Sequence, residues 1–281
     1  MRSSTVAPES SVQGFPEVVG LIPAAGQATR LQPFPCSKEV YPVGFAPDEK
    51  SGLPRPKVAA QYLLEKFRVA GITKAFLVIR DGKWDIPRYF REGDLVGLSL
   101  AYLVIAGSLG PPDTIDRAYP FLAQNRVAFG FPDILFGPED AYARMIRRQE
   151  ETGADVVLGL HRIEDSRVWD MVDCDEGGRV RDIVMKPAST TLTDGWCCAV
   201  WTPRFSAFLH EFLRADETKR NMSRLANRAN DPSGDLAVGV VLQAALKTGL
   251  MLQSVTFPGE RYLDIGTPEN LLKAVREFGA Q

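Results

Sequence analysis

The chain has few of the residues that metal clusters and histidine-based catalysis require. Its 281 residues include four cysteines and two histidines. The cysteines lie at positions 36, 174, 197 and 198 without C-x-x-C spacing, and neither His161 nor His210 lies at ligand spacing from one of them. We therefore expect buried thiols and structural or surface imidazoles, and neither a zinc site nor a disulfide framework.

Long apolar segments and an excess of charge of one sign are also missing. No stretch approaches the roughly 18 apolar residues of a transmembrane helix, and residues 1–16 lack the apolar segment of a signal peptide. The net charge of −2 gives no reason to expect a nucleic-acid or membrane partner. The expectation is a cytoplasmic protein with a flexible N-terminal tail at residues 1–16.

Short apolar runs alternate with helical patterns over the first 160 residues. Strands are expected at 18–22, 75–79, 98–105, 126–129 and 156–160. Helices are expected from Pro56 to Gly71, at 84–91, at 114–123 with a break at Pro120, and at 138–152; residues 45–55 are expected to form a surface loop. Alternating strands and helices indicate a parallel sheet with helices on both faces.

The second half of the chain has a different pattern. Strands are expected at 168–173 and 180–184 around a hairpin-like turn, and at 195–201 and 250–257; helices are expected at 203–213, 236–246 and 268–278. Residues 214–233 are charged and weakly patterned, which predicts a mobile segment. The fold class that follows is α/β, a Rossmann-like three-layer sandwich in one domain of residues 17–281. Its sheet is mostly parallel, with some antiparallel strands in the C-terminal half.

Residues 18–44 (VVGLIPAAGQATRLQPFPCSKEVYPVG) combine an apolar strand, a loop of small residues and two cations. The loop consists of Ala24, Ala25, Gly26, Gln27, Ala28 and Thr29, and the cations are Arg30 and Lys38. Small residues let the backbone approach a ligand, and N–H groups beside a guanidinium suit a triphosphate. A tight strand-to-helix turn with surface cations is the alternative. Because the loop has one glycine where the dinucleotide fingerprint has three, a nicotinamide dehydrogenase is disfavoured.

The same stretch resembles the signature of the sugar-1-phosphate nucleotidyltransferases, also called nucleoside-diphosphate-sugar pyrophosphorylases. That family carries G-x-G-T-R-L-x-P and P-K-x-L-x-P-V, and the counterparts here are GQATRLQP at 26–33 and SKEVYPV at 37–43. The form IPAAG at 22–26 is most similar to the thymidylyltransferase and uridylyltransferase branches. Further matching blocks lie at 55–57, 70–73, 130–137, 178–187 and 262–274, so the resemblance extends from about residue 18 to 275.

The resemblance implies a reaction in which a sugar 1-phosphate attacks the α-phosphorus of a nucleoside triphosphate and pyrophosphate leaves. Such a transfer needs positioning and charge neutralisation more than covalent help. It implies that Arg30 and the loop amides hold the β- and γ-phosphates and that Lys38 lies near the α-phosphate. It also implies Mg²⁺ as cofactor, held by Asp133 and Asp264. A turn or N-cap role is the alternative for either aspartate.

The resemblance also assigns positions to the two substrates. Nucleotide binding falls on Ile105 and Gly110 in addition to the loop, and sugar-phosphate binding falls on Asp170, Met185, Lys186, Gly195 and Trp196. A solvated lysine at a strand end is the alternative for Lys186.

Three of these positions depart from the family pattern. Asp170 replaces a glycine, Met185 replaces a glutamate that bonds the sugar hydroxyls, and Ile105 replaces a base-reading glutamine. The substrates are therefore expected as glucose 1-phosphate with dTTP or UTP by default, without a fixed base or sugar. A non-catalytic nucleotide- or sugar-phosphate-binding regulator on the same fold is the alternative function, and a homo-oligomer is left open.

Overall fold

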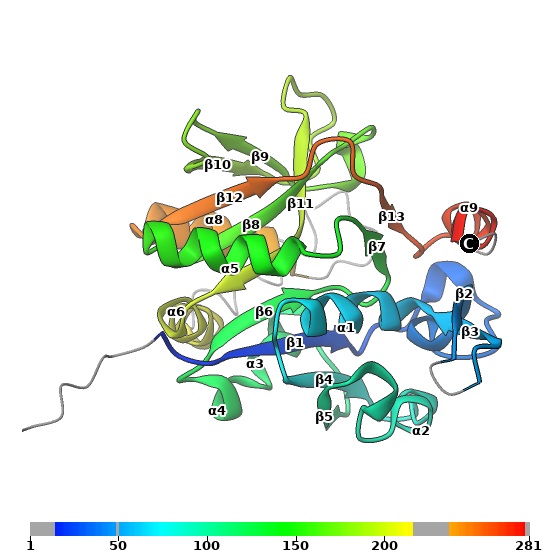
Figure 1. The fold of residues 1–281 in the computed structure, drawn as a ribbon. Coiled ribbons are helices and arrows are strands. Elements are labelled where there is room, and N and C mark those ends of the chain that lie inside the picture. The colour runs from blue at the N-terminus through cyan, green and yellow to red at the C-terminus, as the bar shows by residue number, and fades with distance from the viewer. Residues whose placement is uncertain (1–14, 49–50, 216–235, 279–281) are drawn as a thin grey trace, which may run out of the picture.

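A mixed nine-stranded sheet with helices on both faces forms the centre of the protein (Figure 1). The computed structural model describes residues 15–48, 51–215 and 236–278. Most of the predicted tail at 1–16 and of the predicted mobile segment at 214–233 lies outside these ranges. Within them, no helix has both the length and the apolar composition needed to cross a membrane.

The strands run in the order β10-β9-β11-β6-β1-β4-β5, with β8 paired to β11 and β12 paired to β8. Their bounds are β1 Val18–Ala24, β4 Lys74–Arg80, β5 Ser99–Ile105, β6 Arg126–Gly130, β8 Val156–Arg162, β9 Met171–Cys174, β10 Val180–Val184, β11 Asp194–Trp201 and β12 Leu252–Thr256. The pairings show that β10 and β11 run against the other strands of this sheet. The predicted fold class, mostly parallel with antiparallel strands in the C-terminal half, is confirmed.

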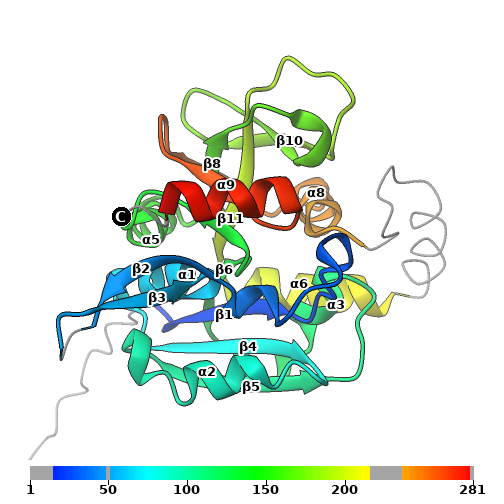
Figure 2. The same ribbon diagram turned by 90° about the vertical axis from the view of Figure 1, so that its right-hand side faces the viewer.

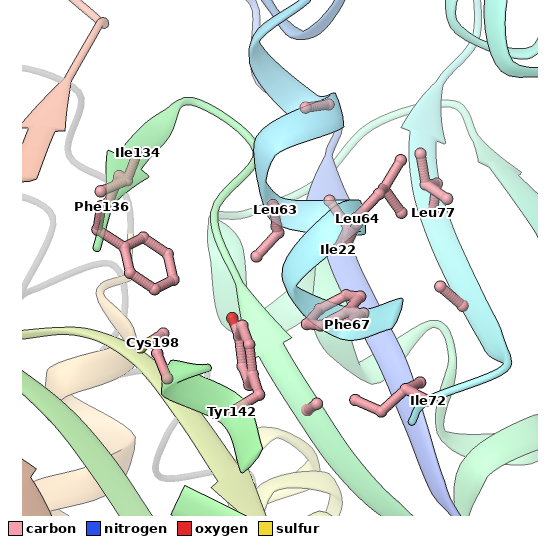
Figure 3. Close-up of a cluster of buried hydrophobic side chains, with 14 of the residues drawn as sticks. Ile22, Leu63, Leu64, Phe67, Ile72, Leu77, Ile134, Phe136, Tyr142 and Cys198 are labelled. Carbon is pink, nitrogen blue, oxygen red and sulfur yellow. The ribbon is translucent and has the colours of Figure 1, made fainter. Parts of the chain in front are cut away.

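Helices cover both faces of the sheet. Their bounds are α1 Ala59–Val69, α2 Asp85–Phe90, α3 Pro111–Asp116, α4 Tyr119–Leu122, α5 Ala141–Thr152, α6 Pro203–Arg214, α8 Val238–Lys247 and α9 Pro268–Phe278, with short 3₁₀ helices η1 Thr29–Leu31, η2 Lys38–Val40, η3 Asp94–Val96 and η4 Ser166–Val168. Against one face, Phe67 of α1 packs edge-on to Tyr142 of α5, with ring centroids 4.7 Å apart (Figure 3). Against the other, Phe205 of α6 packs on Trp201, at 5.3 Å. One buried apolar cluster therefore lies between the sheet and the helices on each face, which gives three layers: helices, sheet and helices.

Strand β1 owes its central place to its composition. Its residues are apolar, and it lies between β4 and β6 with both pairings parallel. Strands covered on both faces have continuous apolar runs. The carboxyl ends of β1, β4, β5 and β6 consequently meet at one edge of the sheet, where ligands gather in open α/β sheets.

Two small ribbons lie beside this edge. One pairs β7 (Ile134–Phe136) with β13 (Tyr262–Asp264), and the other pairs β2 (Pro42–Pro47) with β3 (Pro54–Val58). The β2–β3 ribbon corrects two expectations, because it replaces much of the predicted loop at 45–55 and delays the helix predicted from Pro56 until Ala59. Prolines have a fixed φ that also fits an extended edge strand, so they marked the wrong element here. The last helix, α9, lies against β2 (Figure 2).

Candidate active site

The loop of small residues follows β1 directly and faces outward. Gly26, Gln27, Thr29 and Arg30 are exposed, and a Cβ added to Gly26 would meet nothing within 4 Å. Ala28 takes a left-handed conformation, with φ of 52°. Glycine adopts this conformation at the lowest cost, which explains why the family signature has a glycine at the position that Ala28 occupies.

The N–H groups and the carbonyl groups of this loop differ in their hydrogen bonding. Within the described residues, none of the N–H groups of residues 26–30 donates a hydrogen bond. The carbonyl groups on the other side are bound: Lys83 donates to Ala24 at 2.8 Å and to Gly26 at 3.1 Å, and Arg80 donates to Ala25 at 3.1 Å. A loop with bound carbonyls and open N–H groups has the donor arrangement that suits an anion.

Arg30 reaches from the loop to the segment that follows β13. A Cβ added to Gly266 would lie 2.8 Å from Arg30 Nη2 and 2.9 Å from Asp264 Oδ1. Gly266 N–H also donates to Asp264 Oδ1 at 2.7 Å. The glycine thus leaves the guanidinium and the carboxylate close together, and a side chain at this position would separate them.

The β7–β13 ribbon brings the two predicted metal ligands together. Asp264 pairs with Ile134 across the ribbon, and the N–H of Ile265 donates to the carbonyl of Asp133 at 2.9 Å. Burial raises the pKa of Asp264, and the nearby charge of Asp133 raises it further. The two carboxylates are therefore near enough to repel each other.

Lys38 neutralises the first of these carboxylates. Its Nζ lies 2.5 Å from Asp133 Oδ2, and the two side chains are 15% and 13% exposed. Burial acts against the charge of Lys38, but the attraction of Asp133 and Glu39 raises its pKa to about 12. Burial likewise acts to raise the pKa of Asp133, and the charge and hydrogen bond of Lys38 lower it below its usual value.

This donor set fits a hard divalent cation that also binds phosphate. Two buried carboxylates that repel each other lack a full complement of positive charge, and Asp264 has only partial compensation from Lys38 and Arg30. No group of three or more acidic, histidine or cysteine side chains is placed to hold a metal in the described part of the chain. Mg²⁺ commonly takes one or two carboxylates from the protein and completes its shell with water and substrate phosphates.

The positions assigned to the nucleotide lie at the same edge, two strands away. Ile105 ends β5 and pairs with Arg80, which ends β4. Gly110 precedes α3 with φ of 127°, and its N–H donates to Ser108 Oγ at 3.1 Å. The carbonyl of Leu109 accepts from Leu236, just before α8. The loop that holds Gly110 therefore contacts the segment that leads into α8.

Three of the positions assigned to the sugar phosphate form a second group. The carbonyl of Asp170 accepts from Trp196 N–H at 3.4 Å, and a Cβ on Gly195 would lie 3.1 Å from it. The carboxylate of Asp170 lies against the first turn of α8, because a Cβ on Gly239 would be 2.2 Å from its Oδ2. Negative charge is stabilised there by the partial positive charge of the helix N-terminus.

Met185 and Lys186 follow β10, at the end of the antiparallel part of the sheet. Met185 is 37% exposed, and Lys186 has a left-handed φ of 39°. The structure thus gathers residues 24–30, Lys38, Asp133 and Asp264 in one group and Asp170, Gly195 and Trp196 in another. The roles assigned to all these residues stay predictions.

Four further residues that contact residues 24–26 or 37–39, or lie among them, had no place in the sequence-based prediction. Besides Arg80 and Lys83, they are Glu39, which is 1% exposed and bound by Lys83, and Asp85, which binds Ser37. The sequence held a signal for the cations: they follow the apolar run 75–79, so they stand at the carboxyl end of a parallel strand. No pattern marked Glu39, which neighbours Lys38 in a polar segment.

Comparisons with known proteins agree with this geometry. A model of the nucleotidyl transferase family matches residues 19–281. Two glucose-1-phosphate thymidylyltransferases, from Streptomyces antibioticus and an Actinoplanes species, are 24% and 25% identical over 257 and 263 residues. Both matches cover 91% of this chain, which spans 65% and 76% of the length of those relatives.

Solved structures show the same fold at lower identity. A UDP-glucose pyrophosphorylase complexed with UDP-glucose superposes with a TM-score of 0.72 at 16% identity, over 92% of this chain and 97% of that one. An apo UDP-glucose pyrophosphorylase superposes with a TM-score of 0.73 at the same identity and coverage. The chain therefore belongs to the nucleotidyl transferase family, and the resemblance to the sugar-1-phosphate nucleotidyltransferases is confirmed.

Proposed function

We propose that the protein is a magnesium-dependent nucleotidyltransferase that transfers a nucleoside monophosphate from a nucleoside triphosphate to a sugar 1-phosphate and releases pyrophosphate. The default donor is dTTP or UTP, and the default acceptor is glucose 1-phosphate. One observation carries the proposal: the open N–H groups of residues 26–30, Arg30, Lys38, Asp133 and Asp264 converge at the carboxyl edge of the parallel sheet.

Each of these groups has a role in the proposed transfer. The open N–H groups and Arg30 bind the β- and γ-phosphates, and they stabilise the negative charge that develops on the leaving pyrophosphate. Lys38 exchanges Asp133 for an oxygen of the α-phosphate, where it favours attack by the acceptor phosphate oxygen. The new bond forms at the α-phosphorus as the bond from that phosphorus to the bridging oxygen breaks.

Asp133 and Asp264 would hold the magnesium ion. When bound, the ion neutralises the carboxylates and the phosphate oxygens together. Arg30 lies close to Asp264, because a Cβ on Gly266 would be 2.8 Å from Arg30 Nη2 and 2.9 Å from Asp264 Oδ1. This arrangement lets one set of side chains bind the metal and the triphosphate in a common orientation.

A buried donor supports the placement of the acceptor. Trp196 is 5% exposed, and its Nε1 has no hydrogen-bond partner within the described residues. An unpaired buried N–H costs stability unless a ligand supplies an acceptor. The indole lies 6.1 Å from the ring of Phe131, two residues before Asp133. Because Nε1 is itself covered by neighbouring side chains, an acceptor hydroxyl would bind it only after those side chains move aside, and it would then approach the metal-binding side of the site.

Pyrophosphate release with a matrix of substrates tests the proposal. Each of dTTP, UTP, CTP, GTP and ATP is incubated with Mg²⁺ and a panel of sugar phosphates, and the nucleotide sugar is identified by mass spectrometry. We expect product with wild type and none with Asp133→Asn or Asp264→Asn, while Asp140→Asn, at an exposed ion pair with Arg144, stays active. The enzymatic proposal would be refuted if folded wild-type protein released no pyrophosphate with any pair of nucleoside triphosphate and sugar phosphate.

The non-catalytic regulator remains the second candidate because of Ile105, which places an apolar side chain where the resemblance implies a base-reading amide. Metal-dependent binding of a nucleoside triphosphate without any transfer would favour this candidate. Calorimetric titration of wild type, Asp133→Ala and Asp264→Ala separates the two. If both variants keep metal-dependent binding and some transfer, the metal assignment is wrong.

A further inference from the structure

The turn between β4 and α2 contacts both the loop at residues 24–30 and the segment at residues 37–39, which contains Lys38. This turn, residues 80–85 (RDGKWD), runs from the last residue of β4 to the first residue of α2. Its side chains bind residues 24–26 on one side and residues 37–39 on the other. None of them has a role in the proposed transfer.

On the loop side, the turn binds three successive carbonyl groups. Arg80 Nε donates to Ala25, and Lys83 Nζ donates to Ala24 and Gly26. In a trans peptide unit the C=O and the following N–H point in opposite directions. Fixing the carbonyls of Ala25 and Gly26 therefore turns the N–H groups of Gly26 and Gln27 away from the turn, toward the exposed side of the loop.

On the other side, the turn binds the residues that flank Lys38. Lys83 Nζ lies 2.7 Å from both carboxylate oxygens of Glu39, and Asp85 accepts from Ser37 N–H at 2.6 Å and from Ser37 Oγ at 2.7 Å. Glu39 is 1% exposed and Lys83 13%. Lys38 is thus held through its neighbours at 37 and 39, while its own ammonium stays directed to Asp133.

We infer that Lys83 and Asp85 are positioning residues for the triphosphate. Lys83 couples the loop to the segment at residues 37–39, because its ammonium binds the loop carbonyls and the carboxylate of Glu39 at once. Lys83 orients the loop amides that bind the β- and γ-phosphates, and Asp85 fixes the segment that presents Lys38 to the α-phosphate. The inference rests on the proposed function, since it assigns how that same site is held in shape.

A double substitution separates positioning from simple stabilisation. Lys83→Met alone leaves the buried Glu39 carboxylate without its principal cation and destabilises the fold. Lys83→Met/Glu39→Gln removes both charges, so most of the stability returns, but the carbonyls of Ala24 and Gly26 stay unbound and only that of Ala25 keeps its donor, Arg80. Lys74→Met is the matched control: it removes a lysine from the other end of β4, where the pair with Glu17 is 56% and 48% exposed.

The first readout is the Kd for magnesium pyrophosphate, measured by calorimetry without any acceptor. We expect the folded double variant to bind at least about tenfold more weakly than wild type, because loop amides that are no longer held in place must be ordered when the ligand binds. Lys74→Met should bind like wild type. Double-variant affinity equal to that of wild type would overturn the role of Lys83.

The second readout is steady-state kinetics with the active substrate pair. The double variant should raise the KM for the nucleotide and leave the KM for the sugar phosphate unchanged. Asp85→Asn, whose amide cannot accept both bonds from Ser37, should lower kcat about tenfold with a smaller change in nucleotide KM. Unchanged kcat in folded Asp85→Asn would overturn the role of Asp85.

The outcomes for the two proposals are distinct. Wild type that binds magnesium pyrophosphate but transfers nothing refutes the proposed function, and the comparison of Kd values still decides the role of Lys83. Wild type that transfers normally, with a double variant of unchanged affinity, refutes the positioning role alone. Wild type that binds neither pyrophosphate nor any triphosphate refutes both.

Discussion

Replacing Lys38 by methionine tests how much the ion pair between Lys38 and Asp133 stabilises the folded protein. The ion pair with Asp133 is nearly buried, and its partners raise the pKa of Lys38 from the usual 10.5 to about 12. At about 1.4 kcal/mol per pKa unit, this rise corresponds to about 2 kcal/mol of stabilisation. Breaking a buried pair by removing one partner costs about 3–5 kcal/mol, because the other charge stays buried. We expect a loss of about 2–5 kcal/mol for Lys38→Met.

Urea unfolding in EDTA measures this loss, and thermal unfolding gives a second estimate. A loss of about 3 kcal/mol should lower Tm by about 6–12 °C in a chain of this size. Lys38→Met/Asp133→Asn should recover part of the stability, since it removes the unpaired charge. Lys74→Met, which breaks a half-exposed pair, should cost under about 1 kcal/mol.

The pH dependence follows from the directions of the two pKa shifts. The pKa of Lys38 is raised, so its contribution is complete below about pH 10.5 and is lost as the pH rises through about 12. The pKa of Asp133 is lowered, so its contribution is present above its usual value of 3.8 and is lost as the pH falls below that value. In Lys38→Met, burial acts on Asp133 without the opposing charge of Lys38 and raises its pKa. The difference in unfolding free energy between wild type and Lys38→Met should therefore be largest at pH 9 and should shrink as the pH falls and the variant's buried carboxyl takes up a proton. The coupling between Lys38 and Asp133 would be refuted by a loss of unfolding free energy under about 1 kcal/mol in Lys38→Met. It would also be refuted if the losses caused by Lys38→Met and Asp133→Asn simply added up in the double variant.

Two more substitutions probe the charged groups near the site. Asp264→Asn should raise Tm in EDTA, because burial and Asp133 raise the pKa of Asp264 and its ionised form therefore opposes folding at pH 7. The same variant should abolish transfer with Mg²⁺, since it removes a proposed metal ligand. An unchanged or lower Tm would contradict the argument from the pKa. For buried His161, burial lowers the pKa below 6.5, so stability should fall as the pH drops below 6.5, by at most about 1.4 kcal/mol per pH unit. His161→Phe should flatten that slope in denaturant unfolding between pH 5 and 6.5, and an equally steep slope in the variant would assign it to other groups.

The sequence predicted the elements that bring residues 18–38 to the edge of the sheet because each signal there is local. An apolar strand, a small-residue loop and fixed cations follow one another from Val18 to Lys38, and a parallel sheet brings its carboxyl ends to one edge. The ribbon that joins Asp133 to Asp264 was not predicted. Its two strands have three residues each, too few for periodicity to distinguish a strand from a loop. Family order alone related the two aspartates, and the ribbon supplies the physical cause of their proximity.

The contacts that Lys83 makes with residues 24–26 and with Glu39 could not be predicted from the sequence, for a different reason. Lys83 and Glu39 are 44 residues apart in the chain, and neither lies in a pattern that predicts burial. Their pairing depends on the tertiary position of the β4–α2 turn, which no local propensity specifies. Polar residues that bind each other across a fold are for this reason less predictable than apolar ones, whose spacing reveals the face that they bury.

Asp170 lies in the group of residues that we propose to bind the acceptor, and its carboxylate contacts another part of the protein. Asp170, at a position where the family has glycine, directs its carboxylate to the first turn of α8, where a side chain on Gly239 would collide with it. A carboxylate in that place is stabilised by the helix N-terminus by about 0.3–1 kcal/mol. Its backbone carbonyl still binds Trp196, whose buried Nε1 has no partner within the described residues. Recognition of the acceptor in this protein is therefore expected to depend more on the indole N–H of Trp196 than on the carboxylate of Asp170, so Trp196→Phe should raise the KM for the acceptor more than Asp170→Asn does.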